Sequence, residues 1–282
     1  MTSNIIHREQ IVCGETQTKM IVSGWGEGVI DNSVVEKITY MSDGLKVKGY
    51  LAYPADIPSG EKIPLIIWNR GGYGNKGAID RFTARGVFGQ MASWGYAVLA
   101  SQYRGNDGGE GEEQMGGSDI NDIINLFSVA EELNFIELSN TGVEGWSRGG
   151  MMSLILLREK YDFKCVVLGG AISNLLEIAE TNIKLKSFYK KFFNAGNFEE
   201  DLKKRSAIFY VKDLPDIPYL IMHGGNDDTV PVQQSLKLAE KMLEENKQYR
   251  LVIFEGGDHF LRNHRKEVDR LRKIWFENYL GK

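Results

Sequence analysis

The chain has 282 residues, 42% of them apolar and 26% charged, so it is long enough to bury a core without disulfides or metals. Its formal net charge of −4 argues against nucleic acid as a partner, because phosphate binding needs a basic surface. Two cysteines and the lack of a C-x-x-C motif exclude a disulfide framework. No apolar run approaches the ~18 residues that span a membrane, and the N-terminus lacks the apolar stretch of a signal peptide. We therefore expect a cytoplasmic protein without membrane contact.

The start of the chain divides into an extension and a hairpin. Residues 1–34 mix apolar pairs with charges and glycines, and we interpret them as an N-terminal extension, helical in its early part, that packs on one domain over 35–282. Runs rich in β-branched and aromatic residues cover 35–40 and 46–53 and flank Asp43-Gly44. Asp-Gly between alternating strands is a strong signal for a two-residue hairpin turn. An antiparallel hairpin is therefore expected to open the domain.

Strands and helices alternate along the rest of the domain. Short apolar runs predict buried strands over 63–68, 96–100, 141–144, 163–169, 218–222 and 249–254. Helical spacing of apolar residues predicts helices over 82–94, 118–130, 151–157, 232–246 and 265–279. The helix over 232–246 is expected to carry Leu236, Ala239 and Leu243 on one face. This alternation is typical of an α/β fold with a mostly parallel, doubly wound sheet, where ligands bind at the edge from which the post-strand loops emerge.

Residues 171–208 interrupt this alternation. The stretch is helical in character and too long for a simple crossover, so it predicts a short, cap-like helical insertion after the sixth strand. Its aromatic residues, among them Phe192 and Phe193, indicate an apolar substrate site under a wall or small lid. Ordinary packing onto the sheet is the alternative. Tyr73 and Trp146, next to the motifs described below, complete the candidate substrate-binding residues.

One stretch, Gly145-Trp146-Ser147-Arg148-Gly149, reads G-x-S-x-G between a predicted strand and a predicted helix. In that context the motif indicates a nucleophile elbow, a tight turn that projects the serine hydroxyl into open space. The glycines on both sides let the backbone turn without side-chain clashes. In a chain with 32 glycines the motif alone is weak evidence, so other loops must supply partners for Ser147.

A serine hydroxyl needs a base to take its proton and an acid to orient that base. His259, in the loop after the last strand, is the candidate base for Ser147. The other three histidines lie in the tail, before a glycine at a strand end and at a helix start (His7, His223 and His264). The acid is expected between Ser147 and the histidine, which leaves Asp227 and Asp228, and spacing alone does not separate them. Asp258 is a third option, but it points the wrong way if His259 faces the site.

The oxyanion of a tetrahedral intermediate needs N–H donors. The backbone of Arg148 and of the loop Arg70-Gly71-Gly72 would supply them, with a merely tight turn in that loop as the alternative. Nearby, the acidic run Glu110, Glu112 and Glu113 could bind the amine of a substrate, or it could be a solvated loop.

Three motifs together resemble the catalytic domain of the prolyl-oligopeptidase family of α/β-hydrolases, from about residue 35 to the C-terminus: Gly145-Trp146-Ser147-Arg148-Gly149-Gly150, Tyr103-Arg104-Gly105 and His223-Gly224-x-x-Asp227-Asp228-x-Val230-Pro231. The resemblance implies the α/β-hydrolase fold, Asp227 rather than Asp228 as the acid, and His259 as the base. Two features depart from the family. Only residues 1–34 precede the domain, so the β-propeller that restricts access in those peptidases is not expected. Arg70 stands where a tyrosine often helps to bind the oxyanion, so either its backbone or its charge would act there.

We therefore expect a serine hydrolase that cleaves a peptide or ester bond through an acyl-enzyme, with a prolyl-oligopeptidase-like peptidase as the first hypothesis. A carboxylesterase or a dienelactone-hydrolase-like esterase is the alternative. A non-catalytic binding protein on a hydrolase scaffold would be expected to lack a triad member, and none is missing. The chain has no H-E-x-x-H motif, and we expect no metal and no cofactor. The expected partner is a small-molecule or short-peptide substrate, and a homo-oligomer is left open.

Overall fold

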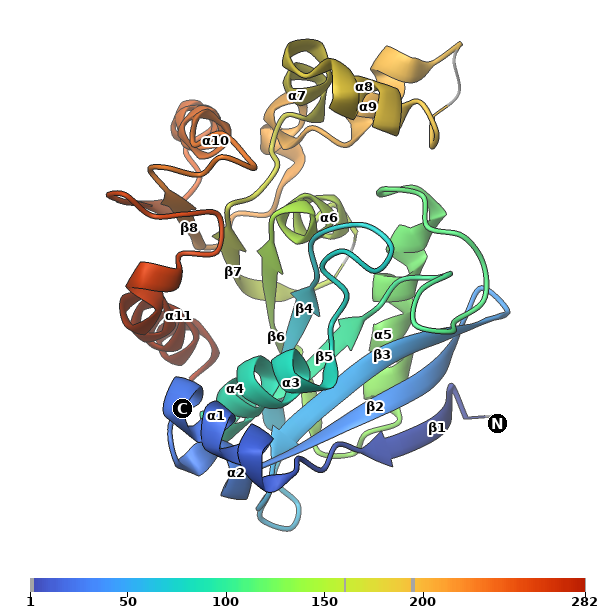
Figure 1. Ribbon diagram of the computed structural model, residues 1–282, viewed down its shortest axis with the longest axis vertical. Helices are drawn as coiled ribbons and strands as arrows, with labels where there is room; N and C mark the ends of the chain where they lie inside the picture. The colour runs from blue at the N-terminus through green and yellow to red at the C-terminus, as the bar shows by residue number, and fades with distance from the viewer. Residues whose placement is uncertain (1–2, 160, 194–195, 282) are drawn as a thin grey trace.

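A nine-stranded sheet forms the centre of the computed structural model, which describes residues 3–159, 161–193 and 196–281 (Figure 1). The strand order is β1-β2-β3-β5-β4-β6-β7-β8-β9. In chain order the strands are β1 (Ile5–Gln10), β2 (Ser33–Ser42), β3 (Leu45–Pro54), β4 (Ile63–Asn69), β5 (Ala97–Ser101), β6 (Ile136–Trp146), β7 (Phe163–Gly169), β8 (Tyr219–Gly224) and β9 (Tyr249–Phe254). Pairing is antiparallel from β1 to β5 and parallel from β5 to β9. The expected mostly parallel sheet, opened by an antiparallel hairpin, is confirmed.

The hairpin of β2 and β3 turns at Asp43 and Gly44, which both have positive φ angles (50° and 78°). This is the backbone geometry that a two-residue hairpin turn requires, and it explains the Asp-Gly pair. The Asp43 carboxylate accepts hydrogen bonds from Arg104 and Asn121, each at 2.8 Å. The tip of the hairpin is therefore hydrogen-bonded to Arg104 and to the first residue of the helix that begins at Asn121.

The N-terminal extension begins with a strand instead of a helix. β1 pairs with β2, so the expectation of helix in the early extension is wrong for residues 5–10. The helices come later, as α1 (Glu15–Trp25) and α2 (Gly28–Asp31). The pairing satisfies backbone N–H and C=O groups along the edge of β2, which outweighs the weak strand character of this polar segment. Because of the added strand, the helical insertion follows the seventh strand rather than the sixth.

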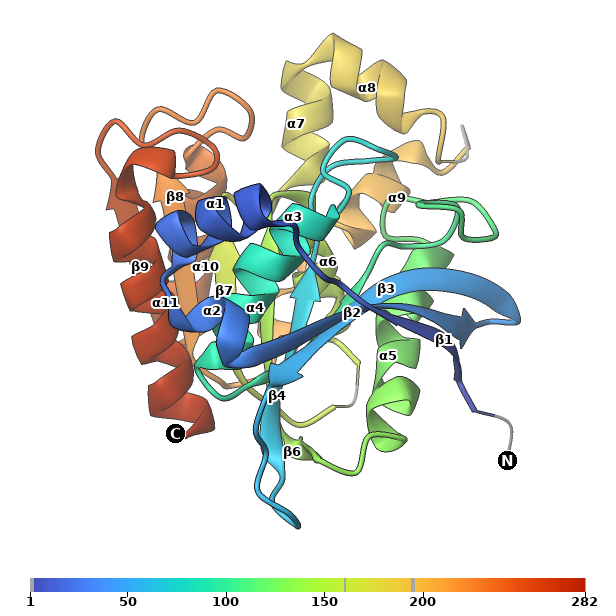
Figure 2. The same ribbon diagram turned by 60° about the horizontal axis from the view of Figure 1, so that its bottom comes forward.

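Helices cover both faces of the sheet (Figures 1 and 2). On one face lie α3 (Arg81–Thr83), a π-helical segment (Ala84–Phe88), α4 (Gly89–Ser93) and α11 (Arg265–Leu280), with α1 and α2 near them. On the other lie α5 (Asn121–Glu131), α6 (Arg148–Leu156) and α10 (Gln233–Glu244). Side chains of β4 alternate between the two cores, with Leu65 and Ile67 in one and Ile66 in the other.

One helix presents a different face from the expected one. In α10 the buried apolar side chains are Leu238, Ala239 and Met242, whereas Leu236 and Leu243 are 46% and 66% exposed. Of the three residues expected on one face, Ala239 therefore lies in the core and the two leucines lie at the surface. Neighbouring positions on a helix are 100° apart, so a small error in phase exchanges core and surface residues.

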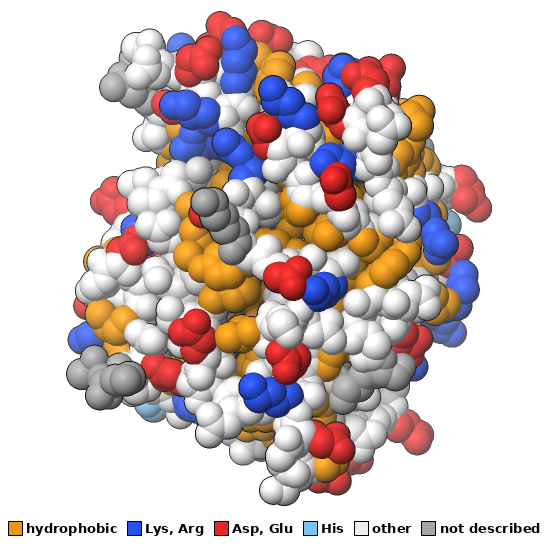
Figure 3. Space-filling view, turned by 180° about the vertical axis from the view of Figure 1, so that it is seen from behind, with side chains coloured by type: hydrophobic (Ala, Val, Ile, Leu, Met, Phe, Trp, Pro, Cys, Tyr) orange, Lys and Arg blue, Asp and Glu red, His pale blue; other side chains and the backbone are white. Residues whose placement is uncertain are grey.

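The insertion is helical, as expected, and consists of α7 (Leu175–Thr181), α8 (Ile183–Tyr189) and α9 (Phe198–Lys204). It lies beyond the carboxyl ends of β4, β6 and β7 (Figure 1). No helix among the described residues is long and apolar enough to cross a membrane. On the back face of the molecule, apolar side chains gather in the middle and acidic and basic ones are interspersed around them (Figure 3).

Candidate active site

The G-x-S-x-G stretch forms a sharp turn between β6 and α6. Ser147 is its central residue, with φ 57° and ψ −124°, a backbone conformation that residues other than glycine rarely adopt. Its N–H donates to the carbonyl of Gly169 at 2.8 Å, which holds the turn against the end of β7. A Cβ at Gly149 would overlap the carbonyl oxygen of Asn69, so only glycine fits there. The turn therefore presents Ser147 at the carboxyl edge of the sheet.

Two loops at this edge bring an aspartate and a histidine together. Nδ1 of His259, after β9, lies 2.7 Å from Oδ2 of Asp227, after β8. The other oxygen of Asp227 accepts the N–H groups of Thr229 (2.9 Å) and Val230 (2.8 Å). Burial opposes ionisation of this carboxyl, but hydrogen bonds from His223, His259 and Val230 hold the pKa of Asp227 well below its usual value. Asp227 is therefore a carboxylate at neutral pH.

The two other candidate acids lie elsewhere. Asp228 is exposed, and its carboxylate accepts a hydrogen bond from the hydroxyl of the next residue at 3.2 Å. Asp258 accepts the N–H of Arg262 at 3.0 Å and pairs with its guanidinium at 3.2 Å. Among the described residues, Asp227 is the carboxylate that contacts His259.

His223 supports the same aspartate. Its Nε2 lies 2.9 Å from the carbonyl oxygen of Val230 and 3.1 Å from Oδ2 of Asp227, so Nε2 carries the proton. Its Nδ1 then accepts the hydroxyl proton of Ser235 at 2.7 Å. This fully buried imidazole holds the aspartate loop against α10.

Trp146 fastens the histidine loop beside the elbow. Its indole N–H donates to the carbonyl of His259 at 2.9 Å, and its ring packs on Gly169. A Cβ built at Gly170 would lie 3.2 Å from Nδ1 of His259, so the imidazole stands against the end of β7, where the carbonyl of Gly169 accepts the N–H of Ser147. The indole N–H of Trp146, expected to meet substrate, is used by the protein itself.

The loop of residues 70–74, which we call the oxyanion loop, passes directly beside Ser147. A Cβ at Gly71 would lie 3.0 Å from Cβ and 3.7 Å from Oγ of Ser147, so glycine is needed for the approach. Among the described residues, no hydrogen bond uses the N–H groups of Gly71, Gly72 or Arg148. These donors are free to meet a ligand oxygen at the serine.

The guanidinium of Arg70 points away from the serine and into the protein. It is fully buried and donates to the carbonyl oxygens of Gln102 and Gly74, each at 3.1 Å. It also pairs with Glu113 at 3.2 Å. Of the two roles left open for Arg70, the charge is therefore used within the protein, in contacts with Gln102, Gly74 and Glu113. Neither role foreseen for Glu113 holds, since this carboxylate is buried and paired rather than solvated or free for a substrate amine.

Aromatic rings from the oxyanion loop and the insertion meet at this edge. Tyr73, 37% exposed, makes edge contacts with Phe188 at 5.3 Å and Phe192 at 4.9 Å between ring centroids. Phe193 is buried and stacks on Tyr189, so it belongs to the core. Phe188 was not singled out from the sequence; it lies near the end of α8, and its ring contacts that of Phe192, which follows the helix, at 5.1 Å between centroids.

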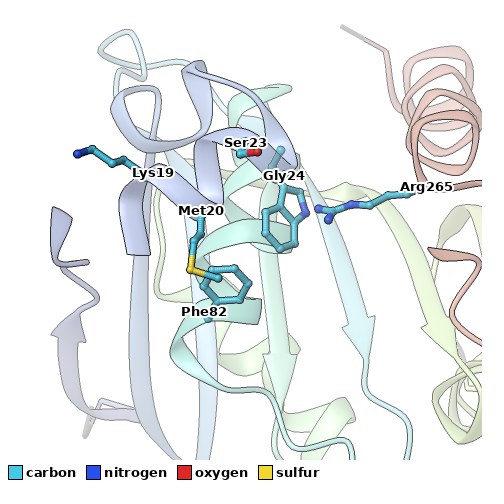
Figure 4. A pocket seen from close by; sticks show the side chains of 7 residues that line it. Lys19, Met20, Ser23, Gly24, Phe82 and Arg265 are labelled. Carbon is cyan, nitrogen blue, oxygen red and sulfur yellow. The ribbon is translucent and has the colours of Figure 1, made fainter. Parts of the chain in front are cut away.

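A cavity of about 430 Å³ lies away from these residues, between α1, α3 and α11 (Figure 4). It is lined by Lys19, Met20, Ser23, Gly24, Trp25, Phe82 and Arg265. Arg265 stacks over the indole of Trp25, with Cζ 3.7 Å from the ring centroid. None of the predicted site residues lines this cavity. In the part of the chain that the structure describes, no group of three or more His, Cys, Asp or Glu is arranged to hold a metal.

Comparison with known proteins gives likenesses in sequence and fold. The family model described as prolyl oligopeptidase family matches residues 84–282. The uncharacterized peptidase YtmA of Bacillus subtilis is 28% identical over 246 residues, which cover 86% of this chain and 92% of that protein. Human dipeptidyl peptidase 8 is 27% identical over 231 residues, 78% of this chain and 25% of that protein. Acylaminoacyl peptidase of Pyrococcus horikoshii superimposes with a TM-score of 0.74 and 26% identity, covering 87% of this chain and 42% of that one.

A second solved structure, an acylaminoacyl peptidase in complex with Z-Gly-Gly-Phe-chloromethyl ketone, gives a TM-score of 0.76 at 27% identity and covers 87% of this chain. The chain spans most of YtmA but 41% of the length of this structure, so it corresponds to one part of the longer relatives. The fold is the α/β-hydrolase fold that the resemblance implied. With a family model matched over most of its length and peptidases among its relatives, the chain belongs to the prolyl oligopeptidase family of serine peptidases.

Proposed function

We propose that this chain hydrolyses short peptides with Ser147 as nucleophile, His259 as general base and Asp227 as the residue that orients the base. The observation that carries the proposal is the 2.7 Å hydrogen bond between His259 and Asp227 beside a serine with φ 57°. These residue types come from three separate loops. A serine, a histidine and a carboxylate in this order are the parts that acyl transfer to a serine requires.

The proposed reaction begins when Oγ of Ser147 attacks the peptide carbonyl and its proton passes to Nε2 of His259. Nε2 is free to accept because Nδ1 carries the proton that it donates to Asp227. The oxyanion accepts hydrogen bonds from the N–H of Arg148 and from Gly71 or Gly72. Collapse of this intermediate expels the amine, which takes the proton from His259. Water then attacks the acyl-enzyme by the same route and regenerates Ser147.

Peptide substrates are supported by the peptidases among the relatives. We propose that the aromatic group of Tyr73, Phe188 and Phe192 receives an apolar side chain of the substrate, because Tyr73 is part of the oxyanion loop and contacts both phenylalanines. Phe193 and Trp146 are assigned to packing and to the histidine loop instead. The cytoplasmic location, short peptides as the preferred class and the assembly state stay predictions.

The nucleophile is tested by labelling with a fluorophosphonate probe. The wild type is expected to be labelled, and Ser147→Ala is expected to lose the label while keeping its thermal unfolding transition. Asp227→Asn is expected to stay folded and to lose about 10⁴-fold in kcat, the typical loss when the histidine tautomer is no longer fixed. Equal labelling of the wild type and Ser147→Ala would refute the assignment.

The bond type is tested with matched substrates. Rates on aminoacyl-p-nitroanilides and on p-nitrophenyl acyl esters, both corrected by Ser147→Ala, separate amide from ester hydrolysis. Amide hydrolysis with measurable kcat is expected. Turnover of esters alone would favour the esterase alternative.

A further inference from the structure

A buried set of four charged side chains lies directly behind the oxyanion loop. The loop cluster consists of Arg70, Glu113, Asp119 and Arg148, whose side chains are at most 4% exposed. Glu113 pairs with Arg70 at 3.2 Å and with Arg148, which pairs in turn with Asp119 at 2.7 Å. Two positive and two negative charges balance within the cluster. Each ion is therefore compensated without solvent.

Glu113 is the member that joins the other parts. One carboxylate oxygen meets both arginines, and the other accepts the N–H of Gly74 at 2.9 Å. The arginines hold loop carbonyls, Arg148 that of Gly72 at 2.9 Å and Arg70 that of Gly74 at 3.1 Å. A single carboxylate thus fixes both ends of the oxyanion loop to the residue that follows the serine.

A tyrosine with a strained backbone, Tyr103, contacts both arginines of the loop cluster. The guanidinium carbons of Arg70 and Arg148 lie 5.3 and 4.8 Å from the ring centroid of Tyr103. The hydroxyl of Tyr103 donates to the carbonyl of Arg70 at 3.1 Å. Tyr103 has φ 62°, an outlier for a bulky side chain that persists only where the surroundings determine it. The conformation indicates that the position of this ring is specified closely.

We infer that Glu113 is a positioning residue for hydrolysis, which sets the N–H groups of the oxyanion loop against the N–H of Arg148 without touching substrate. The inference rests on the proposed function of Ser147. Buried ion pairs add little net stability, but they fix the relative orientation of the groups that they join, because the charges are compensated only in one geometry. The loop has no strand ladder over these residues, so the carboxylate of Glu113 supplies the orientation that a ladder would otherwise give. Loss of the Glu113 carboxylate should weaken the stabilisation of the transition state, where the oxyanion forms, and leave substrate binding in the ground state unchanged.

The test compares Glu113→Gln with Glu131→Gln, a matched control whose exposed side chain lies at the C-terminal end of α5. For Glu113→Gln we expect kcat to fall by about 10²-fold, the low end of the loss for one oxyanion donor, with KM within about threefold of wild type. The rate of fluorophosphonate labelling should fall in parallel. Glu131→Gln should keep wild-type kcat. A kcat for Glu113→Gln equal to that of the control overturns the inference, whatever its thermal unfolding temperature.

Two further measurements distinguish failure of the proposed function from failure of the positioning role of Glu113. If Glu113→Gln does not fold, Glu113→Asp keeps the charge but shortens the reach to the arginines, and wild-type kcat in this variant overturns the inference. If Ser147→Ala is labelled as fast as the wild type, the proposed function fails. If labelling depends on Ser147 but is equally fast in folded Glu113→Gln, the positioning role fails alone.

Discussion

Two buried ion clusters flank the serine, and they differ in what they hold. The loop cluster joins α6 to the oxyanion loop. The helix cluster, formed by Glu144, Asp269 and Arg272, joins β6 to α11 and is equally buried around its central pair. Arg272 meets Glu144 at 2.8 Å and Asp269 at 2.8 Å. Glu144 lies three residues before Ser147, and Arg148 lies one residue after it.

The difference between the clusters lies in the elements that they connect. α11 is already seated by apolar contacts, since Phe276 is buried against Gly142 of β6, so the helix cluster adds to a position that packing has set. The oxyanion loop makes apolar ring contacts through Tyr73, whereas the backbone at Gly72 and Gly74 is held by hydrogen bonds to the loop cluster. The same chemistry is therefore expected to serve stability on one side of β6 and turnover on the other.

The largest expected effect comes from breaking the helix cluster. Arg272→Leu leaves Glu144 buried without its main partner, which should lower the free energy of unfolding by about 3–5 kcal/mol. Urea denaturation measures the loss, and Lys273→Leu, at an exposed neighbour, is the control. The activity per folded molecule should stay near wild type. A fall in kcat as large as that of Glu113→Gln would erase the contrast between the clusters.

Two adjacent phenylalanines of the insertion, Phe192 and Phe193, are expected to show the same contrast between an effect on activity and an effect on stability. Phe193→Ala empties a core position and should cost about 3 kcal/mol of unfolding free energy, whereas Phe192→Ala removes a half-buried ring and should cost less. Phe192→Ala should instead raise KM for substrates with apolar side chains. Denaturation and steady-state kinetics on one substrate series measure both. Equal stability losses with unchanged KM would argue against the aromatic substrate site.

A pair of buried tyrosines sharpens the comparison at smaller scale. Tyr103→Phe removes the hydroxyl that holds the Arg70 carbonyl, and Tyr40→Phe removes one that donates to the carbonyl of Asp122. Each should cost about 1 kcal/mol of stability, the net worth of a typical hydrogen bond. Only Tyr103→Phe should also lower kcat, by roughly tenfold, a loss of about 1.4 kcal/mol at the transition state. Equal kcat values in the two variants would contradict a role for Tyr103 at the loop.

The smallest expected effect comes from removing two of the three members of the helix cluster, Glu144 and Arg272, together. Glu144→Leu combined with Arg272→Met replaces a buried ion pair by apolar side chains and should restore the unfolding free energy to within about 1 kcal/mol of wild type. The single Glu144→Leu variant, measured under the same urea conditions, is the reference. A double variant as unstable as the single ones would mean that the pair itself, and not the uncompensated charge, carries the stability.

Local signals in the sequence predicted much of this molecule. The Asp43-Gly44 turn, the apolar parallel strands and the elbow around Ser147 each depend on neighbours in the chain, so short patterns predict them. The segment that forms β1 is polar and alternates weakly, and its strand state comes from pairing with β2. The choice of Asp227 over Asp228 as the candidate acid required either the family resemblance or the observed contact with His259.

The loop cluster could not be predicted from the chain alone. Glu113 meets Arg70 and Arg148 across 43 and 35 positions, and no spacing rule links residues so distant. The acidic run around Glu113 indicated a solvated or amine-binding loop because charge patterns do not reveal burial. Two buried arginines near one buried glutamate become interpretable only when the loops are folded together.

The backbone of Ser147 has a consequence for how this protein can change over time. A serine at φ 57° and ψ −124° holds about 1–3 kcal/mol of strain that glycine would relieve. Ser147→Gly is therefore the substitution by which this fold could gain heat resistance while losing its proposed nucleophile. Selection for thermal tolerance alone would favour that loss, and selection for turnover must continually oppose it. The residue proposed to do the chemistry is thus also a place where the sequence is not optimised for its own fold.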